Sequence, residues 1–371
     1  MRALVTGGAG FIGSHLADAL LAEGIQVRLL DNLDPQVHGP AGNRPAYLNP
    51  AAELQMGDIR DRNAVARALE DVDAVFHRAA AVGVGQSMYE IDRYVSVNSL
   101  GTAVLLEGII EKRDRIRKII VASSMSVYGE GAYRNQSGET VAPRPRPLAH
   151  LEAHRWDLTD CLGGALAPIP TPESKDLCPT SVYAVTKRDQ EELFLVTGAA
   201  YKIPAVALRF FNTYGPRQAL SNPYTGLLAI VCSQLMNGHR PLVFEDGCQT
   251  RDFVHVSDIA RANLLALKSD HAAGHAYNVG TGQPITVLGV IALLAERMGV
   301  RVSPEVANRY RAGDIRHCYA DLKRICADLG FKPRVALQQG IDDLIPWIRT
   351  QQSADHVRTV LSDLERRVLL H

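Results

Sequence analysis

The segment that sets the architecture reads Arg2-Ala-Leu-Val-Thr-Gly-Gly-Ala-Gly-Phe-Ile-Gly13, and a helical run from Ser14 to Ala22 follows it. Arg2–Thr6 is short and apolar, as expected for a buried strand. A strand, a glycine-rich turn and a helix in this order bring backbone N–H groups and a helix N-terminus to one place, where a diphosphate can bind. The glycine spacing fits both Gly-x-x-Gly-x-x-Gly and Gly-x-Gly-x-x-Gly. The segment therefore predicts an α/β protein with a parallel sheet that binds a dinucleotide.

A carboxylate follows the second predicted strand, Gln26–Leu30, at about the distance expected for a contact with an adenosine ribose. Asp31 stands 18 residues after Gly13, and Asn32 is next to it. Because a 2′-phosphate facing Asp31 would be repelled, this carboxylate favours NAD over NADP. The alternative is a glycine turn that binds no ligand.

Three further predicted strands end in residues suited to a cofactor site. Ala74–His77 leads into Arg78-Ala-Ala-Ala81, whose small side chains let a cofactor approach closely. Lys118–Ala122 ends in the hydroxyl cluster Ser123-Ser-Met-Ser-Val-Tyr-Gly129. Leu54–Met56 is followed by Asp58, which either bonds the adenine amino group or is an ordinary turn carboxylate.

Tyr183-Ala-Val-Thr-Lys187 places a tyrosine and a lysine on one face of a predicted helix, Ser181–Ala200. A phenol has a reference pKa of about 10, so it is a poor base near neutrality. Lys187 could supply the positive charge that favours the phenolate. Alone, the pair is a weak signal that a solvated helix face also explains. The glycine turn and the hydroxyl cluster make it a candidate catalytic pair.

Bulk composition narrows the possible partners. The chain has 371 residues, and its 40 basic residues match its 40 acidic residues. This balance argues against nucleic acid or an anionic membrane as a partner. No apolar run approaches the roughly 18 residues of a membrane span, and no leader precedes Arg2, so we expect a cytoplasmic protein. Six dispersed cysteines without a Cys-x-x-Cys pair fit reduced thiols.

Between Glu130 and Thr180 the regular pattern of strands and helices stops. The segment is rich in proline and longer than an ordinary loop, so we expect an insertion that could act as a lid. We expect a short helix within it at Leu151–Trp156. No close pair of metal ligands is present, and we expect no metal site.

Five motifs in this order closely resemble the extended short-chain dehydrogenase/reductase family, and within it the nucleotide-sugar epimerases and dehydratases. They are Thr6-Gly-Gly-Ala-Gly-Phe-Ile-Gly13, Ser123-Ser-Met-Ser-Val-Tyr-Gly129, Tyr183-x-x-x-Lys187, Arg209-Phe-Phe-Asn-Thr-Tyr-Gly-Pro-Arg217 and Arg251-Asp-Phe-Val-His-Val256. The resemblance runs from residue 1 to about 350 and is weakest in the insertion. It implies a Rossmann-like doubly wound parallel sheet with a smaller α/β substrate-binding domain.

The resemblance also implies a division of the chain. Residues 1–205, with the insertion at about 130–180 and a return segment at about 252–280, would form the NAD-binding domain. Residues 206–251 and 281–350 would bind a nucleotide-diphosphate sugar, and 351–371 would form a charged peripheral tail. The homologous enzymes pair two helices into a four-helix bundle, so we expect a homodimer built on Asp92–Lys112 and Ser181–Ala200.

Site residues carried over from the family fall into three groups. NAD, tightly bound and recycled, would contact Gly7, Gly10, Phe11, Ile12, Gly13, Asp31, Asn32, Asp58, Ile59, Ala79, Ala80, Asn98, Ser123, Tyr183 and Lys187. Ser124, Tyr183 and Lys187 would be catalytic. The sugar nucleotide would contact Ser124, Tyr183, Asn212, Arg251, Arg311, Asp314 and Cys318. Arg251 and Arg311 would neutralise the diphosphate, since guanidinium forks give both charge and orientation. Cys318 is either a gate beside the sugar or a buried structural thiol.

The implied chemistry begins with removal of hydride from a carbinol carbon, whose hydroxyl proton must leave as well. Tyr183 would take that proton while Ser124 bonds the same hydroxyl, giving a 4-keto sugar. If the keto sugar turns over in the site, hydride returns to its other face and C4 is inverted.

The residues after Ser124 discriminate among related reactions. Family dehydratases have an Asp-Glu pair there, whereas this chain has Met125 and Ser126, which favours epimerisation. The insertion resembles one in a bacterial subgroup that acts on dTDP-L-rhamnose to give dTDP-6-deoxy-L-talose, and we expect this reaction. The alternatives are a UDP-hexose (UDP-glucose or UDP-GlcNAc) 4-epimerase, a 4-keto-sugar reductase using NADPH, or a non-catalytic NAD-binding regulator.

Overall fold

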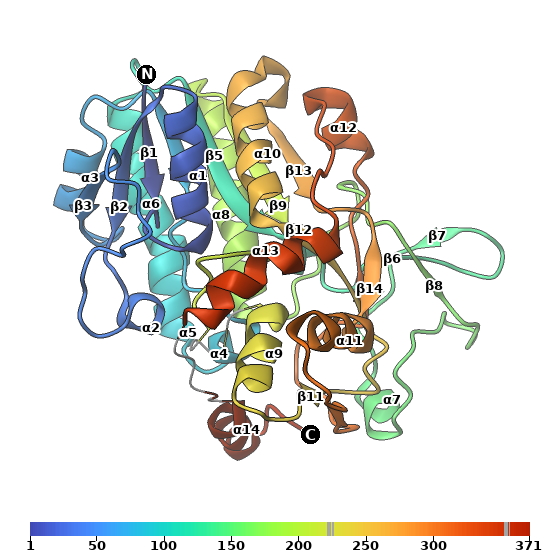
Figure 1. Cartoon of the computed structure of the whole chain (residues 1–371). Coiled ribbons are helices and arrows are strands. Elements are labelled where there is room, and N and C mark those ends of the chain that lie inside the picture. The colour runs from blue at the N-terminus through green and yellow to red at the C-terminus, as the bar shows by residue number, and fades with distance from the viewer. Residues whose placement is uncertain (221–223, 225, 352–354, 356) are drawn as a thin grey trace.

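The computed structural model describes residues 1–220, 224, 226–351, 355 and 357–371. A seven-stranded sheet in the order β13-β9-β5-β4-β1-β2-β3 forms its centre (Figure 1). The strands are β1 (Arg2–Thr6), β2 (Gln26–Asp31), β3 (Glu53–Met56), β4 (Ala74–His77), β5 (Lys118–Ser124), β9 (Ala205–Phe210) and β13 (His275–Val279). All neighbours pair in parallel, so every carboxyl end lies at the same edge of the sheet.

Helices cover both faces of this sheet, which confirms the predicted doubly wound fold (Figure 1). One face packs against α1, α10 and α12, and the other against α3, α6 and α8. Their bounds are α1 (Phe11–Ala22), α3 (Arg62–Ala68), α6 (Gly101–Glu111), α8 (Val182–Tyr201), α10 (Val256–Lys268) and α12 (Lys323–Leu329). Strands buried on both faces need nearly continuous apolar runs, as the Lys-Ile-Ile-Val-Ala stretch that begins β5 provides.

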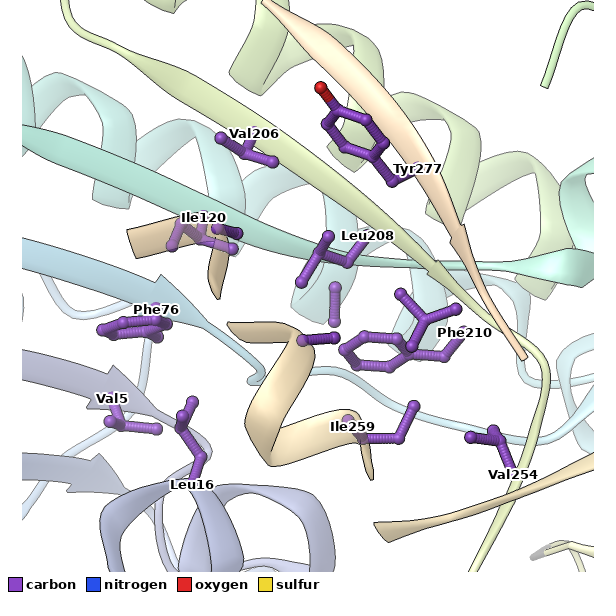
Figure 2. Packing of buried hydrophobic residues seen from close by; sticks show 14 of the residues in the cluster. Val5, Leu16, Phe76, Ile120, Val206, Leu208, Phe210, Val254, Ile259 and Tyr277 are labelled. Atoms are coloured by element: carbon purple, nitrogen blue, oxygen red, sulfur yellow. The ribbon is translucent and has the colours of Figure 1, made fainter. Parts of the chain in front are cut away.

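Consecutive strand residues alternate between the two cores, because side chains along a strand point to opposite faces. Val5, Phe76 and Ile120 face the side of α1 and α10 (Figure 2). Their neighbours in sequence, Leu4, Val75 and Ile119, belong to the cluster on the other side. The three central strands thus hold the two helical layers together.

The predicted helix Asp92–Lys112 forms, but it is not a regular α-helix. It consists of α5 (Ile91–Tyr94), a π-helical turn η1 (Val95–Leu100) and α6. Such turns insert one extra residue per turn and are frequent near functional sites. The turn contains Asn98, which is fully buried.

A second layer lies beyond the main sheet and has its own core. Its sheet runs β10-β12-β14, with β16 pairing with β12. The strands are β10 (Asn212–Tyr214), β12 (Thr250–His255), β14 (Pro284–Thr286) and β16 (His317–Cys318), and the helices packed there are α9 (Leu227–Met236), α11 (Val287–Met298) and α13 (Leu337–Arg349). A two-stranded pair, β11 (Leu242–Val243) and β15 (Glu305–Val306), lies apart. The division into domains stays a prediction.

The insertion contains a small antiparallel sheet that the sequence did not predict. Its strands are β6 (Ala132–Arg134), β7 (Thr140–Val141) and β8 (Ala167–Ile169). The expected helix Leu151–Trp156 is displaced to α7 (Leu148–Glu152). It begins directly after Pro147 and is capped by Ala153, and the next residue, His154, has a φ of 54°.

The predicted tail helix is α14 (Val357–Arg366), although residues 352–354 and 356 of the tail lie outside the described residues. Short helical turns complete the chain: α2 (Pro35–His38), α4 (Val84–Ser87), η2 (Met125–Tyr128) and η3 (Asp270–Ala272). Among the helices that the structure describes, none has the length and apolar character needed to cross a bilayer.

Leu208→Ala should destabilise the protein by about 2–5 kcal/mol, because Leu208 is fully buried in β9 and its removal leaves a cavity between tightly packed layers. Urea unfolding followed by circular dichroism measures the change. Leu162→Ala is the matched control, since Leu162 is 92% exposed and its truncation removes almost no packing. Equal effects of the two substitutions would contradict this description of the core.

Candidate active site

A cavity of about 430 Å³ runs along the carboxyl edge of the main sheet. It is bordered by the glycine turn, by the ends of β2, β4, β5 and β9, and by the start of α8. Ligands bind at this edge in open parallel sheets. The sequence-predicted residues that line it are Gly7, Gly10, Phe11, Ile12, Gly13, Asp31, Asn32, Asp58, Ile59, Ala79, Ala80, Ser123, Ser124, Tyr183, Lys187 and Asn212.

The glycine turn leaves no room for side chains. Gly7 has a φ of 63°, and a Cβ there would lie 2.7 Å from the backbone nitrogen of Ala79 on the β4 side. A Cβ on Gly13 would lie 2.3 Å from the carbonyl oxygen of Gly7. Gly10 precedes α1 and provides no side-chain cap for its first N–H groups. The turn thus presents bare backbone donors to the cavity, as a dinucleotide diphosphate requires.

Asp31 is held in place by backbone amides. Its Oδ2 accepts from the N–H of Ala9 at 2.9 Å and its Oδ1 from the N–H of Leu33 at 2.9 Å. A carboxylate oxygen has a second lone pair, so each can still accept a ligand hydroxyl. The geometry suits the predicted ribose contact.

Asp58 carries more partners than the sequence indicates. Arg60 donates to both of its carboxylate oxygens at 2.8 Å, and Asn32 Nδ2 donates to Oδ2 at 3.3 Å. The hydrogen bonds from Arg60 lower the pKa of Asp58 to about 2, so the carboxylate stays ionised. The sequence did not predict a role for Arg60, because this residue belongs to no recognised motif although it lies only two residues after Asp58.

Tyr183 lies in the first turn of α8, two residues after the N-cap Ser181, whose Oγ accepts from the N–H of Ala184 at 3.1 Å. Burial raises the pKa of Tyr183 to about 12, and a hydrogen bond with Ser124 opposes the rise. Nζ of Lys187 donates to Gln190 Oε1 and not to Tyr183, so the support of the phenolate that the sequence assigns to Lys187 stays a prediction.

Lys187 is buried, and its Nζ donates to Gln190 Oε1 at 2.6 Å. Burial and, to a smaller extent, the positive charge of Arg78 lower the pKa of Lys187, Glu191 partly opposes them, and the net result is a pKa of about 7. Its charge therefore changes near neutrality. Neither Gln190 nor Arg78 was predicted, although Gln190 stands three residues after Lys187 on the same helix face.

Three lining residues carry buried polar atoms without a partner among the described residues. One is the donor Arg78 Nε, and the other two are the acceptor atoms Ser123 Oγ and Asn212 Oδ1. Buried polar atoms are almost always hydrogen-bonded, so these two fit atoms that a bound molecule would satisfy. With the glycine turn and Asp31, they show that the cavity suits NAD.

Asn98 does not line the cavity. Its Oδ1 accepts from the N–H of Ala81 at 2.7 Å, and its Nδ2 donates to Ala81 O at 3.1 Å and to Thr186 Oγ1 at 2.9 Å. The side chain thus ties the segment after β4 to α8. Any effect of Asn98 on a cofactor would pass through these neighbours.

Arg251, Arg311, Asp314 and Cys318 also lie outside the cavity lining. Arg251 Nη2 donates to Ile315 O at 2.7 Å. Arg311 Nε donates to Asp314 Oδ2 at 2.9 Å, and its guanidinium lies over the Phe244 ring at 4.4 Å. Their contacts with a sugar diphosphate stay predictions.

Cys318 is fully buried beside the insertion. Its thiol lies 3.7 Å from Thr171 Oγ1, and burial raises its pKa to about 12. The gate hypothesis for this residue stays a prediction.

The insertion packs against the segment 311–318. Glu130 accepts from the N–H of Arg316 at 2.8 Å, and Thr180 Oγ1 donates to Gly313 O at 2.9 Å. Arg146 Nη2 donates to Asp314 O at 3.2 Å, and it also pairs at 2.8 Å with Glu245, a buried residue outside this segment. These contacts fix the backbone of the segment that carries three of the predicted substrate residues. In the part of the chain that the structure describes, His, Cys, Asp and Glu form no cluster suited to a metal.

A family model matches residues 3–150 and 158–280, and it describes the NAD dependent epimerase/dehydratase family. The chain belongs to this family. It is similar to a dTDP-L-rhamnose 4-epimerase of Burkholderia thailandensis, at 38% identity over 350 residues, which cover 94% of each chain.

Solved structures agree with this family. The UDP-glucose 4-epimerase of Thermotoga maritima, solved with UDP-glucose, has a TM-score of 0.77 and 30% identity, covering 94% of this chain and 99% of its own. A UDP-glucose 4-epimerase of Thermus thermophilus, solved with NAD, has a TM-score of 0.75 and 30% identity, covering 95% and 100%. The predicted Rossmann-like fold, NAD as cofactor and the class of nucleotide-sugar epimerases are thereby confirmed.

Gly13→Ala should weaken NAD binding by about tenfold or more, because the new Cβ would collide with the Gly7 carbonyl and displace the turn. Isothermal titration with NAD measures the loss. Gly85→Ala is the control: it also adds a methyl group to a helical glycine, but the nearest atom is 3.9 Å away. Unchanged NAD affinity of a folded Gly13→Ala variant would contradict the role of the turn.

Proposed function

We propose that this epimerase inverts C4 of dTDP-L-rhamnose to give dTDP-6-deoxy-L-talose through a 4-keto intermediate. The similarity to a dTDP-L-rhamnose 4-epimerase along 94% of both chains carries this choice of substrate. The residues after Ser124 agree with it, because Met125 and Ser126 supply no carboxyl pair for eliminating water.

Tyr183 is the proposed base and Ser124 its partner. When bound, NAD accepts a hydride from C4 and returns it. Tyr183 takes the proton of the C4 hydroxyl, and Ser124 hydrogen-bonds the same oxygen as it becomes a carbonyl. Return of the proton from Tyr183, together with the hydride on the opposite face, completes the inversion without net oxidation.

The charge of Lys187 supports this proton transfer. A phenol with a pKa raised by burial needs nearby positive charge to act as a base, and Lys187 lies one helical turn away on the same face. Arg251 and Arg311 are proposed to neutralise the sugar diphosphate if their present partners are exchanged for it.

A UDP-hexose 4-epimerase is the second candidate. The structural neighbour from Thermotoga maritima is named for UDP-glucose and was solved with it. Both candidates share the C4 chemistry. They differ in the nucleotide, which is thymidine or uridine diphosphate, and in the hexose, which is a 6-deoxy L-sugar or a D-sugar with a 6-hydroxyl.

Tyr183→Phe should lower turnover by a factor on the order of 100 or more, because only the proton-accepting oxygen is lost. NAD binding should be almost unchanged, which titration checks in the same preparation. Near-normal turnover in that variant would remove Tyr183 from the role of base.

Purified protein without added cofactor should convert dTDP-L-rhamnose to the C4-inverted product, since NAD is recycled. Products from a panel of dTDP- and UDP-sugars are assigned by NMR. Conversion of UDP-glucose but not of dTDP-L-rhamnose would replace the first proposal with the second.

We further propose a homodimer that pairs α8 and the α5–α6 helix with the same helices of a second copy. Val185 and Val196 lie on one side of α8 and are 52% and 68% exposed, while Val95 and Leu100 on the neighbouring helix are 45% and 53% exposed. Together they form an apolar surface on adjacent helices, which pairing would remove from water.

Light scattering at micromolar concentration should give the mass of a dimer, and Val196→Asp should give a monomer, because a buried unpaired carboxylate opposes association. Leu148→Asp, an equally apolar exposed site in the insertion, should leave the dimer intact. A monomeric wild-type protein would refute the proposal.

A further inference from the structure

Behind Lys187, between α8, α6 and β4, lies a buried chain of polar side chains. Lys187, Gln190, His77 and Thr102 are 4%, 0%, 1% and 0% exposed. Lys187 Nζ donates to Gln190 Oε1 at 2.6 Å. The other end of the same amide, Gln190 Nε2, donates to Thr102 Oγ1 at 2.9 Å and lies 3.0 Å from His77 Nε2. Such chains fix the orientation of each member when every polar atom is satisfied.

The neighbours fix which way the amide of Gln190 points. Thr102 uses its single proton on the carbonyl oxygen of Asn98, so its oxygen accepts from Gln190. His77 Nε2 lies 3.0 Å from Gln190 Nε2 and 2.9 Å from Thr102 Oγ1, and in the tautomer that carries the proton on Nδ1 it accepts the second amide proton of Gln190. That Nδ1 lies 2.7 Å from Thr6 Oγ1, within reach of a hydrogen bond. The amide nitrogen is thus saturated, and its oxygen is left for Lys187.

The charges around Lys187 make this contact unusual for a buried amine. Among the described residues, no carboxylate lies within 4.0 Å of its Nζ. Glu191, which lies one turn further along α8, pairs with Arg209 at 2.5 Å. Arg78, at the end of β4, is positive, and His77 is uncharged because burial holds its pKa well below the usual value. Tyr183 faces the cavity on the same helix side.

We propose that Gln190 is a positioning residue, which holds Lys187 by one of its three N–H donors and directs the other two toward the cofactor cavity. The inference rests on the proposed role of Lys187 in binding NAD and supporting Tyr183. An amide suits this task because it accepts without adding negative charge. A carboxylate in the same place would form an ion pair and cancel the positive charge that Tyr183 needs.

The sign of the pH effect follows from the groups present. NAD binding that uses the ammonium form of Lys187 is complete below its pKa of about 7 and declines as pH rises through that value. Gln190→Glu adds an opposite charge and moves the decline to higher pH. Gln190→Met is similar in size but lacks the oxygen that accepts from Lys187, so it moves the decline of NAD binding to lower pH. It also weakens NAD binding at the pH values where the wild-type lysine is charged.

The experiment is titration of NAD into the full chain between about pH 5 and pH 10, with the thermal midpoint recorded for each variant. In Gln190→Glu we expect the midpoint of the alkaline decline in NAD affinity to rise by about one pH unit or more. In Gln190→Met we expect the NAD affinity below pH 7 to fall about tenfold. Thr102→Val, nearly isosteric, should act like Gln190→Met but less strongly, because it removes only the acceptor that orients the amide.

Two controls separate this inference from a general loss of stability. Gln234→Met replaces another buried glutamine, 3% exposed on α9, and should leave the NAD profile unchanged. Lys187→Met should abolish the pH-dependent decline. Folded Gln190→Glu and Gln190→Met variants with the wild-type profile would overturn the proposal, and so would a decline that survives Lys187→Met.

NAD titration contains no sugar, so it stays independent of the substrate assignment. Failure to epimerise any sugar in the panel, with the NAD profiles shifted as expected, would reject the proposed reaction and leave the role of Gln190 standing. Epimerisation of a sugar by the wild-type protein, with NAD profiles that the Gln190 substitutions leave unshifted, would support the proposed reaction and reject the role of Gln190.

Discussion

The close approach of the glycine turn to the end of β4 is the constraint on which the site depends. A Cβ on Gly7 would lie 2.7 Å from the backbone of Ala79, so the two segments touch through backbone alone. This contact joins the first strand to the fourth at the carboxyl edge of the sheet. Beside it lies the cavity, which is bordered by the glycine turn, by the ends of β2, β4, β5 and β9, and by the start of α8.

Hydrogen bonds between side chains behind the cavity hold α8 against the sheet. Ser181 caps α8 and so fixes the start of the helix that carries Tyr183 and Lys187. Asn98, in the π-helical turn, joins α8 to the segment after β4. Gln190 joins the same helix to α6 and β4 through Thr102 and His77. Because interior polar groups must be satisfied, these bonds leave α8 little freedom to move relative to the sheet.

The insertion packs against the segment 311–318, whose predicted substrate residues lie outside the cavity lining. Its contacts with the segment 311–318 come from buried, charged side chains: Glu130 accepts from the N–H of Arg316, and Arg146 donates to the carbonyl oxygen of Asp314 while it pairs with Glu245. Removing one member of such a pair leaves a buried charge unpaired, so the insertion and the segment 311–318 should be stable only together. A substrate contact made by Arg311 would depend on this arrangement.

The sequence by itself determined the parallel α/β architecture and the cofactor, and it named many of the residues between Gly7 and Lys187 that line the cavity. Glycine spacing, strand ends and helical periodicity are local patterns, and each acts over a few residues. Gln190 and Arg78 are different, because their roles depend on what lies across the sheet. The tertiary structure alone decided that Lys187 meets an amide instead of a carboxylate, and that Cys318 and Arg251 face neighbours away from the cavity. Burial and hydrogen-bond partners come from segments distant in the chain, so no local pattern could specify them.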